Sequence, residues 1–269
     1  MKRNFYLALV IAAASCASSA WAASTWSQNL VADCTSSNVA SQPCSGNPAV
    51  TVSGWSTTGS GSTFAAASVY NWGTNAGLGV VSSTESSSQT GPHAIDNSGS
   101  IDALLLNFTG GPVNLSSLSI GWNGTDNATT TNGVNYNDSD LSILAWVGVG
   151  TPTMSGSGLL SSGWKLIGNY GNVGSLTNNT ADASNSTYSS YWLISAYSTA
   201  YGTTSANGLS LDQGNDAFKV LSVAGNTCTG TVSGGQCVPN KTPEPGSVAL
   251  LGVGLLGLIA SRRRQTKKR

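Results

Sequence analysis

The sequence predicts an all-β body, an antiparallel β-sandwich of jelly-roll-like type, between two terminal segments of different character. Three observations support this fold class. Short apolar or alternating runs recur between turns rich in Gly, Asn, Ser and Asp, which is the pattern of strands joined by polar loops. No alternation of strands with helical segments indicates a parallel sheet. Eight Trp and eight Tyr are spread along the chain, which argues for a packed core.

The first 22 residues have the layout of a secretory signal peptide. Lys2 and Arg3 precede the apolar run Phe5–Ala14, and the segment ends on small residues at Ala20–Ala22. A charged region, an apolar region and an A-x-A site in that order predict Sec-dependent export and cleavage by signal peptidase after Ala22. The alternative, a buried N-terminal helix, leaves this three-part layout unexplained.

The body, residues 23–241, contains eight ranges that we expect to form strands and one that is ambiguous. Uninterrupted apolar runs at 101–108 and 141–149 predict buried strands. Alternating runs predict half-buried strands at 118–122, 164–167, 191–197 and 218–223. The signals at 50–55 and 77–81 are weaker, and 64–70 fits either a strand or a helical turn. Residues 225–241 are expected to form a small closing loop.

Four cysteines remain in the body, in two close pairs near its two ends. Three pairings are possible, and we favour Cys34 with Cys44 and Cys228 with Cys237, since short loops close at low entropic cost. Cross-pairing would instead join the two ends of the domain. A metal site is disfavoured because neither spacing is C-x-x-C.

The whole-chain charge of zero conceals an acidic body. Most Lys and Arg lie in the terminal segments, so residues 23–243 hold three lysines against ten acidic residues and are about seven units negative. Nucleic acid is therefore excluded as a partner, whereas cations are favoured.

The C-terminus combines three features in a fixed order. Pro243-Glu244-Pro245 precedes an uncharged apolar span, 246–260, and a basic tail that begins with Arg262, Arg263 and Arg264. At about 1.5 Å per residue the span reaches roughly 22 Å, short of the ~30 Å hydrocarbon core. The basic tail predicts that the C-terminus stays in the cytoplasm. An ordinary C-terminal membrane anchor is the alternative.

This order of features, over residues 242–269, resembles the PEP-CTERM sorting signal of Gram-negative bacteria. The resemblance implies a transient inner-membrane anchor, cleavage by an exosortase (a membrane transpeptidase) near Pro243–Pro245, and delivery to the outer surface or the medium. The body is also similar to a family of exosortase-dependent surface proteins, through segments at 77–80, 93–97, 120–122, 144–146 and 216–220.

Calcium is the ligand that the polar loops favour, and no other cofactor is predicted. Asp126, Asp138 and Asp140 lie in two loops rich in carboxylate and amide oxygens, and Asp212–Asp216 forms another such loop. These hard oxygens suit Ca²⁺, but the spacing is not that of an EF-hand. Solvated Asx turns are the alternative interpretation.

Catalysis has little support in the sequence. His93, the sole histidine, could be oriented by Asp96 as a base, but a turn histidine making local hydrogen bonds is the simpler interpretation. We therefore expect a structural or adhesive, non-enzymatic protein of the surface or extracellular matrix, associated with exopolysaccharide. Two alternatives remain. One is a carbohydrate-binding module that uses Trp55, Trp72, Trp122 or Tyr191, and the other is a secreted hydrolase.

Overall fold

The computed structural model describes residues 24–57, 63–83, 85, 93–124, 130–131, 134–135, 138–154, 159–238, 252 and 254. The predicted signal peptide, Asp126, the motif Pro243–Pro245 and Arg262–Arg264 lie outside these residues. Within the predicted span 246–260, only Gly252 and Gly254 are described, and both are helical. Among the described residues, no helix is long and apolar enough to cross a membrane.

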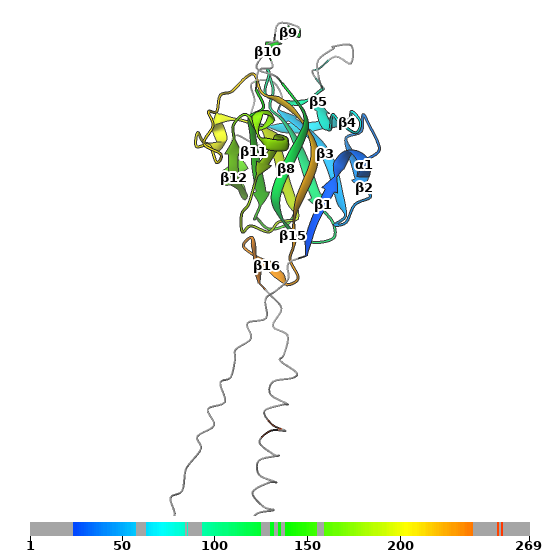
Figure 1. The fold of residues 1–269 in the computed structure, drawn as a ribbon, viewed down its shortest axis with the longest axis vertical. Helices are drawn as coiled ribbons and strands as arrows, with labels where there is room; N and C mark the ends of the chain where they lie inside the picture. Colours follow the sequence, from blue (N-terminus) through cyan, green and yellow to red (C-terminus); the bar gives the residue numbers. More distant parts are fainter. Residues whose placement is uncertain are drawn as a thin grey trace, which may run out of the picture.

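In its described residues the body is an all-β structure with one short α-helix (Figure 1). The strands are β1 (Thr25–Asn29), β2 (Ser41–Cys44), β3 (Val50–Thr57), β4 (Phe64–Asn71), β5 (Leu78–Val81), β6 (Ile95–Asp96), β7 (Asp102–Phe108), β8 (Val113–Asn123), β9 (Thr130–Thr131), β10 (Val134–Asn135), β11 (Leu141–Trp146), β12 (Trp164–Tyr170), β13 (Thr180–Asp182), β14 (Tyr191–Ala196), β15 (Ala217–Thr227), β16 (Thr231–Ser233) and β17 (Gln236–Val238). The helix is α1 (Leu30–Asp33), and the 3-10 turns are η1 (Leu159–Ser161), η2 (Val173–Ser175), η3 (Thr177–Asn179) and η4 (Thr199–Tyr201).

All eight ranges predicted as strands contain one, and the ambiguous range 64–70 is a strand rather than a helical turn. Several boundaries differ from the prediction, since β8, β12 and β15 extend beyond the predicted ranges 118–122, 164–167 and 218–223. The strand expected at 141–149 ends at Trp146, because a turn that includes Gly150, with φ +75°, follows. The closing loop expected at 225–241 instead holds the β16–β17 hairpin. Its turn residues Gly234 and Gly235 both have positive φ, as a tight hairpin turn requires.

One antiparallel sheet of 13 strands folds into two layers. The order β12-β11-β14-β7-β3, with β2 beside β3, makes the first layer. The order β5-β15-β8-β13, with β1 and β6 beside β15, makes the second layer. Strand β4 connects them, since Phe64–Ala67 pair with β3 and Ser68–Asn71 pair with β5.

The main hydrophobic core lies between the two layers. Leu104 and Leu106 of β7 face it from the first layer, and Ile120 of β8 and Phe218 of β15 face it from the second. Side chains alternate along a strand, so the neighbours of these core residues point to the other face of each layer. The shared core is the reason that the two layers stay together.

A second hydrophobic cluster covers the outer face of the first layer. It includes Leu105 of β7, Leu193 of β14 and Trp146 of β11, together with Met154 and Tyr201 from the connecting segments. The prediction that 191–197 is half-buried is therefore wrong, because this second cluster buries the outward side chains of β14 as well. Sequence alternation could not reveal a cover made by distant loops.

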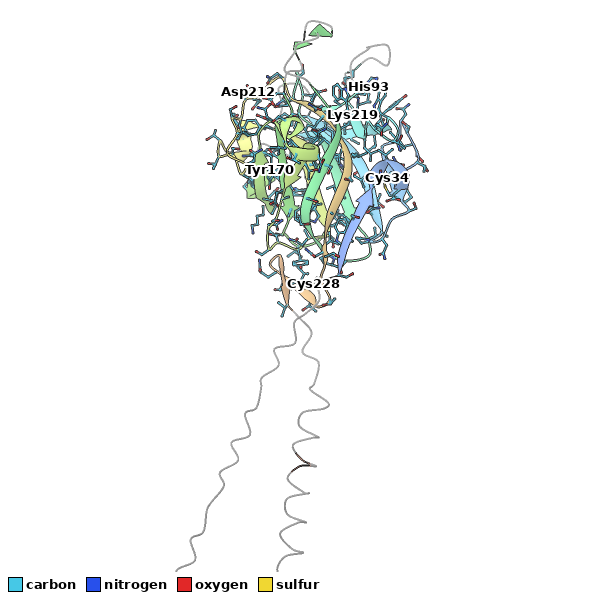
Figure 2. All side chains as sticks on the ribbon, viewed as in Figure 1. Cys34, His93, Tyr170, Asp212, Lys219 and Cys228 are labelled. Atoms are coloured by element: carbon cyan, nitrogen blue, oxygen red, sulfur yellow. A yellow bond between two sulfur atoms is a disulfide. The ribbon has the colours of Figure 1, made fainter. Side chains whose placement is uncertain are left out.

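Both disulfides have the pairing that loop length favours. Cys34 is bonded to Cys44, with 4.3 Å between their Cα atoms, and this bond joins the end of α1 to β2. Cys228 is bonded to Cys237 across the β16–β17 hairpin, with 5.7 Å between the Cα atoms. Figure 2 shows Cys228 at one end of the body, and His93, Lys219 and Asp212 at the opposite end.

Candidate functional site

Four acidic side chains, here called the four-acid cluster, meet at the end of the body that lies opposite the hairpin (Figure 2). Asp138 and Asp140 precede β11, and Asp212 and Asp216 precede β15. One carboxylate oxygen from each lies within 4.8 Å of the other three. Asp212 is exposed, whereas the other three are buried. A parallel β-bridge between Asp138 and Asp216 holds the two segments side by side.

Asp140 is the hydrogen-bonding centre of this cluster. Its Oδ1 accepts from the N–H of Asn172 at 2.7 Å, and its Oδ2 accepts from the N–H of Asp212 at 2.8 Å. Its own N–H donates to Asp216 Oδ1 at 2.9 Å. The other oxygen of Asp216 accepts from the side-chain amide of Asn97. Asp140 therefore fixes two loops relative to the start of β11.

Burial and the repulsion between neighbouring carboxylates raise the pKa values of two acids in the four-acid cluster. Burial raises the pKa of Asp140 to about 7, against the lowering effect of the Asn172 hydrogen bond, and the charge of Asp138 adds to the rise. Burial and the charge of Asp140 raise the pKa of Asp216 to about 9. A bound divalent cation would offset the same repulsion without protonation.

The structure brings together two of the three predicted calcium ligands and adds two others. Asp138 and Asp140 are in the cluster, and Asp126 lies outside the described residues. Asp212 and Asp216, which the sequence places in a separate oxygen-rich loop, complete the set. The sequence signal was present, but 72 residues separate Asp140 from Asp212, and only the pairing of strands brings them together.

An aromatic cluster lies near the same end of the body. It consists of the contacting rings of Tyr70, Trp72 and His93, and of Trp122, which together with Trp72 faces the amine of Lys219. The His93 ring stacks with Tyr70 at 5.6 Å and with Trp72 at 5.7 Å between ring centroids. The Lys219 Nζ lies 4.6 Å from the centroid of the Trp72 ring and 4.2 Å from that of Trp122. These distances are within the range of cation–π attraction.

Tight backbone packing holds Trp72 beside Trp122. The turn after Trp72 lies against β8 at Gly121, where an added Cβ would be 2.7 Å from the carbonyl oxygen of Ala76. Burial lowers the pKa of Lys219 to about 8, while the facing rings favour its charged form. The amine is thus held between two indole rings, with its side chain only 5% exposed.

The four aromatic residues predicted as sugar-binding candidates fall into two groups. Trp72 is 42% exposed, and Trp122 is half-buried in the same cluster. Trp55 and Tyr191 are half-buried against the hydrophobic cluster on the outer face of the first layer. The structure therefore brings together Trp72 and Trp122 and separates them from the other two. Tyr70, His93 and Lys219 were missed as members of such a site.

His93 has neither of the environments that the sequence suggests. Its Nδ1 is buried and has no hydrogen-bond partner, and among the described residues no hydrogen bond joins it to Asp96. Stacking with Tyr70 and Trp72, rather than local hydrogen bonds, fixes the ring. A base oriented by Asp96 is not the arrangement seen.

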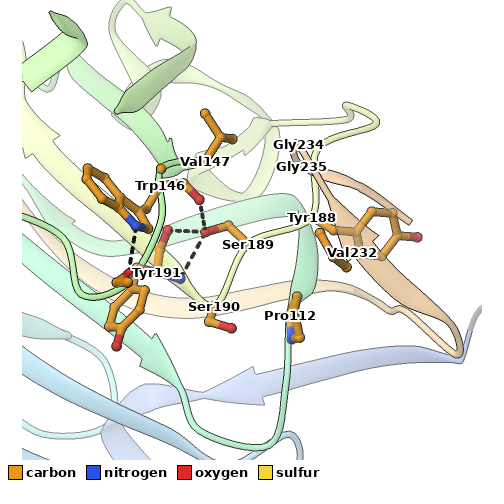
Figure 3. A pocket seen from close by; sticks show the side chains of 12 residues that line it. Pro112, Trp146, Val147, Tyr188, Ser189, Ser190, Tyr191, Val232, Gly234 and Gly235 are labelled. Carbon is orange, nitrogen blue, oxygen red and sulfur yellow. Dashed lines mark hydrogen bonds between the residues drawn. The ribbon is translucent and has the colours of Figure 1, made fainter. Parts of the chain in front are cut away.

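A cavity of about 200 Å³ lies beside the β16–β17 hairpin (Figure 3). Trp146, Tyr188 and Tyr191 contribute its larger side chains. Its central hydroxyl, on Ser189, lies 2.7 Å from the carbonyl oxygen of Trp146 and 2.8 Å from that of Tyr191. The Trp146 indole N–H donates to the carbonyl oxygen of Gly150 at 2.9 Å. These polar groups are already paired within the protein.

Comparison with known proteins bears on the C-terminus. Residues 241–264 match the family model of the PEP-CTERM protein-sorting motif. No curated protein and no solved structure is detectably similar to the chain. The chain therefore carries a PEP-CTERM sorting motif at its C-terminus. The similarity of its body to exosortase-dependent surface proteins stays a prediction.

Proposed function

We propose that this chain is an exported surface or extracellular-matrix protein with a structural or adhesive role and no catalytic activity. The PEP-CTERM motif at 241–264 carries the proposal, because this motif marks a substrate of an exosortase. Signal peptidase would remove residues 1–22, the inner membrane would hold the chain transiently, and the exosortase would then release or transfer the body.

The shape of the body supports a display function. The last described residue of the body, Val238, precedes the matched motif by three residues and belongs to the hairpin end. The four-acid and aromatic clusters lie at the opposite end (Figure 2). A body tethered through the hairpin would present these clusters away from the membrane.

We describe the body as a jelly-roll-like sandwich, because β5, β7, β8 and β11 alternate between the two layers.

Intact-mass analysis in the native host tests the processing step. The mature wild-type protein should lack residues 1–22 and all residues beyond a cleavage site near Pro243–Pro245. Replacement of Pro243, Glu244 and Pro245 by alanine should leave the full C-terminal mass in the membrane fraction. Thr266→Ala, outside the matched residues, is the control and should be processed normally. A wild-type protein that keeps its complete tail would contradict the proposal.

Calcium is the ligand that we propose for the four-acid cluster. Four carboxylates within 4.8 Å supply the hard oxygen donors that Ca²⁺ prefers. Addition of EGTA to protein purified with calcium should lower its melting temperature, since a ligand that binds only the folded state stabilises it. Asp138→Asn should reduce this difference. An unchanged melting temperature in EGTA would exclude a stabilising calcium ion.

Carbohydrate binding is the second candidate function, and the exposure of Trp72 favours it. The residue is 42% exposed and its ring lies beside His93 and Trp122, so a flat apolar surface is available for a sugar ring. Exopolysaccharide from the host should retain the full chain in a pull-down, and Trp72→Ala should reduce retention at least fivefold. Leu209→Ala, at another exposed apolar residue, is the control. Equal retention of both variants would exclude Trp72 from binding.

A further inference from the structure

A second group of acids lies apart from the four-acid cluster. Glu85 follows β5, Asp96 is in β6, and Asp102 begins β7. One carboxylate oxygen from each lies within 4.8 Å of the other two. Asp96 is 4% exposed and Asp102 is 1% exposed, whereas Glu85 is half-buried. Two of the three carboxyl groups are therefore removed from water almost entirely.

An orphaned oxygen distinguishes this group from an ordinary hydrogen-bonded cluster. Asp102 Oδ1 is fully buried and has no hydrogen-bond partner. By contrast, both carboxylate oxygens of Asp140 accept backbone N–H groups. A buried carboxylate oxygen without a donor is costly and rare in folded proteins. Its presence beside two further carboxylates points to a positively charged ligand.

No basic side chain in the described part of the chain supplies that charge. Both lysines of the described body are engaged elsewhere. Lys165 donates to the Thr187 hydroxyl at 2.9 Å, and Lys219 lies between two tryptophan rings. The charged neighbours that act on Asp102 are the acids Asp96 and Glu85. Burial and these like charges raise the pKa of Asp102 well above its usual range, against the lowering effect of a hydrogen bond with the Ser56 side chain. The three acids must therefore bind a cation, or Asp102 must remain protonated.

We propose that Glu85, Asp96 and Asp102 form a second site for a divalent cation of the calcium class. The donors are all carboxylate oxygens, which suit Ca²⁺ and Mg²⁺ but not ions that prefer nitrogen or sulfur ligands. Donor atoms within 4.8 Å fit around one ion, since opposite ligands of Ca²⁺ are about 4.8 Å apart at a Ca–O distance of about 2.4 Å. Backbone carbonyl oxygens and water would complete the coordination.

The position of the site gives the ion a structural role. Asp96 pairs through β6 with β15 in the second layer, whereas Asp102 lies on β7 in the first layer. One ion would therefore connect the two layers at the end away from the hairpin. The adjacent residue Asn97 donates to Asp216 of the four-acid cluster. The two acid groups are thus connected through the neighbouring residues Asp96 and Asn97, and His93 of the aromatic cluster precedes Asp96 by three residues.

Calcium titration of the full chain in mild detergent tests the proposal. After removal of divalent ions, isothermal titration with CaCl₂ is compared for wild type, Asp102→Asn and Asp138→Asn. The wild type should show binding at both sites. Asp102→Asn should weaken the second site at least tenfold and leave the four-acid site unchanged, and Asp138→Asn should have the reverse effect. This reciprocal pattern separates failure of the second site from failure of calcium binding at the first.

Melting in EGTA distinguishes a ligand from a packing residue. Asp102→Asn keeps the shape of the side chain and replaces a buried carboxyl group, which must be protonated when no cation is bound, by a neutral amide, so it should melt at or above the wild-type temperature in EGTA. Addition of calcium should raise the melting temperature of this variant by less than it raises that of the wild type. Glu85→Gln, at the half-buried position, is the second variant if Asp102→Asn fails to fold, and should also weaken calcium binding tenfold or more. Unchanged calcium affinity in both variants, or no binding of Ca²⁺ or Mg²⁺ outside the four-acid site, would overturn the proposal.

Discussion

Replacement of Asp140 by alanine should destabilise the body through lost hydrogen bonds, separately from any effect on calcium. The Asp140 carboxylate accepts the N–H groups of Asn172 and Asp212 at 2.7 and 2.8 Å. Alanine leaves both donors without this acceptor. Each unsatisfied donor costs about 1–3 kcal/mol, and both bonds are only part-buried, so we take the lower half of that range. The free energy of unfolding should fall by about 2–4 kcal/mol.

Asp140→Asn is the matched control, because its amide oxygen can accept one of the two N–H groups. Its free energy of unfolding should fall by about half as much as that of the alanine variant, roughly 1–2 kcal/mol. Both variants are compared with wild type in EGTA by thermal unfolding followed by tryptophan fluorescence. At roughly 2–4 °C per kcal/mol for a body of this size, alanine should lower the melting temperature by roughly 5–15 °C. Equal stability of alanine and wild type, or equal losses for both variants, would refute the reasoning.

Three further predictions concern the same body. First, in EGTA the free energy of unfolding should fall as pH rises from about 4 to about 8, because burial and neighbouring acids raise the pKa of Asp96 to about 8 and that of Asp216 to about 9. The folded state holds these protons and the unfolded state releases them above about pH 4. Urea titrations at several pH values should show that the free energy of unfolding falls less steeply with pH in Asp216→Asn than in wild type. A rise in stability from about pH 4 to about pH 8 would contradict the raised pKa values. Second, replacing both Cys34 and Cys44 by serine should lower the free energy of unfolding by about 2–3 kcal/mol, as expected for a loop of ten residues; a loss below about 0.5 kcal/mol, which is within the error of urea titration, would show that the bond adds little. Third, Gly121→Ala should cost about 1–3 kcal/mol, since the new Cβ would lie 2.7 Å from a backbone oxygen; a melting temperature equal to wild type would show that the turn can move away.

The strands were predictable because each is a local pattern. Runs such as 101–108 and 218–223 carry their apolar residues within the segment itself, and all eight ranges predicted as strands contain one. Strands β1 and β2 were missed, since Thr25–Asn29 and Ser41–Cys44 are short and mostly polar. They form because β15 and β3 offer them hydrogen-bonding edges. Pairing partners of this kind are not visible in a local window.

The candidate sites were predictable only as fragments. Asp138 and Asp140 stand two residues apart and attract attention as a pair, but 119 residues separate Asn97 from Asp216. Glu85, Asp96 and Asp102 carry no local motif at all. Likewise, Trp72 and Trp122 are single aromatic residues in the sequence, and they become neighbours only because the turn before β5 packs on Gly121.

The sequence by itself determined how this protein is addressed and what kind of fold it has. A sorting motif is recognised as a linear segment, so Pro243, Glu244 and Pro245 show their role without any tertiary structure. Strand periodicity and close cysteine spacing are equally local. The tertiary structure alone decided which acids form a buried cluster, which side chains surround Lys219 and which faces of the sheet are covered. These properties depend on contacts between distant segments, and antiparallel pairing through β15 and β8 brings those segments to one end of the body.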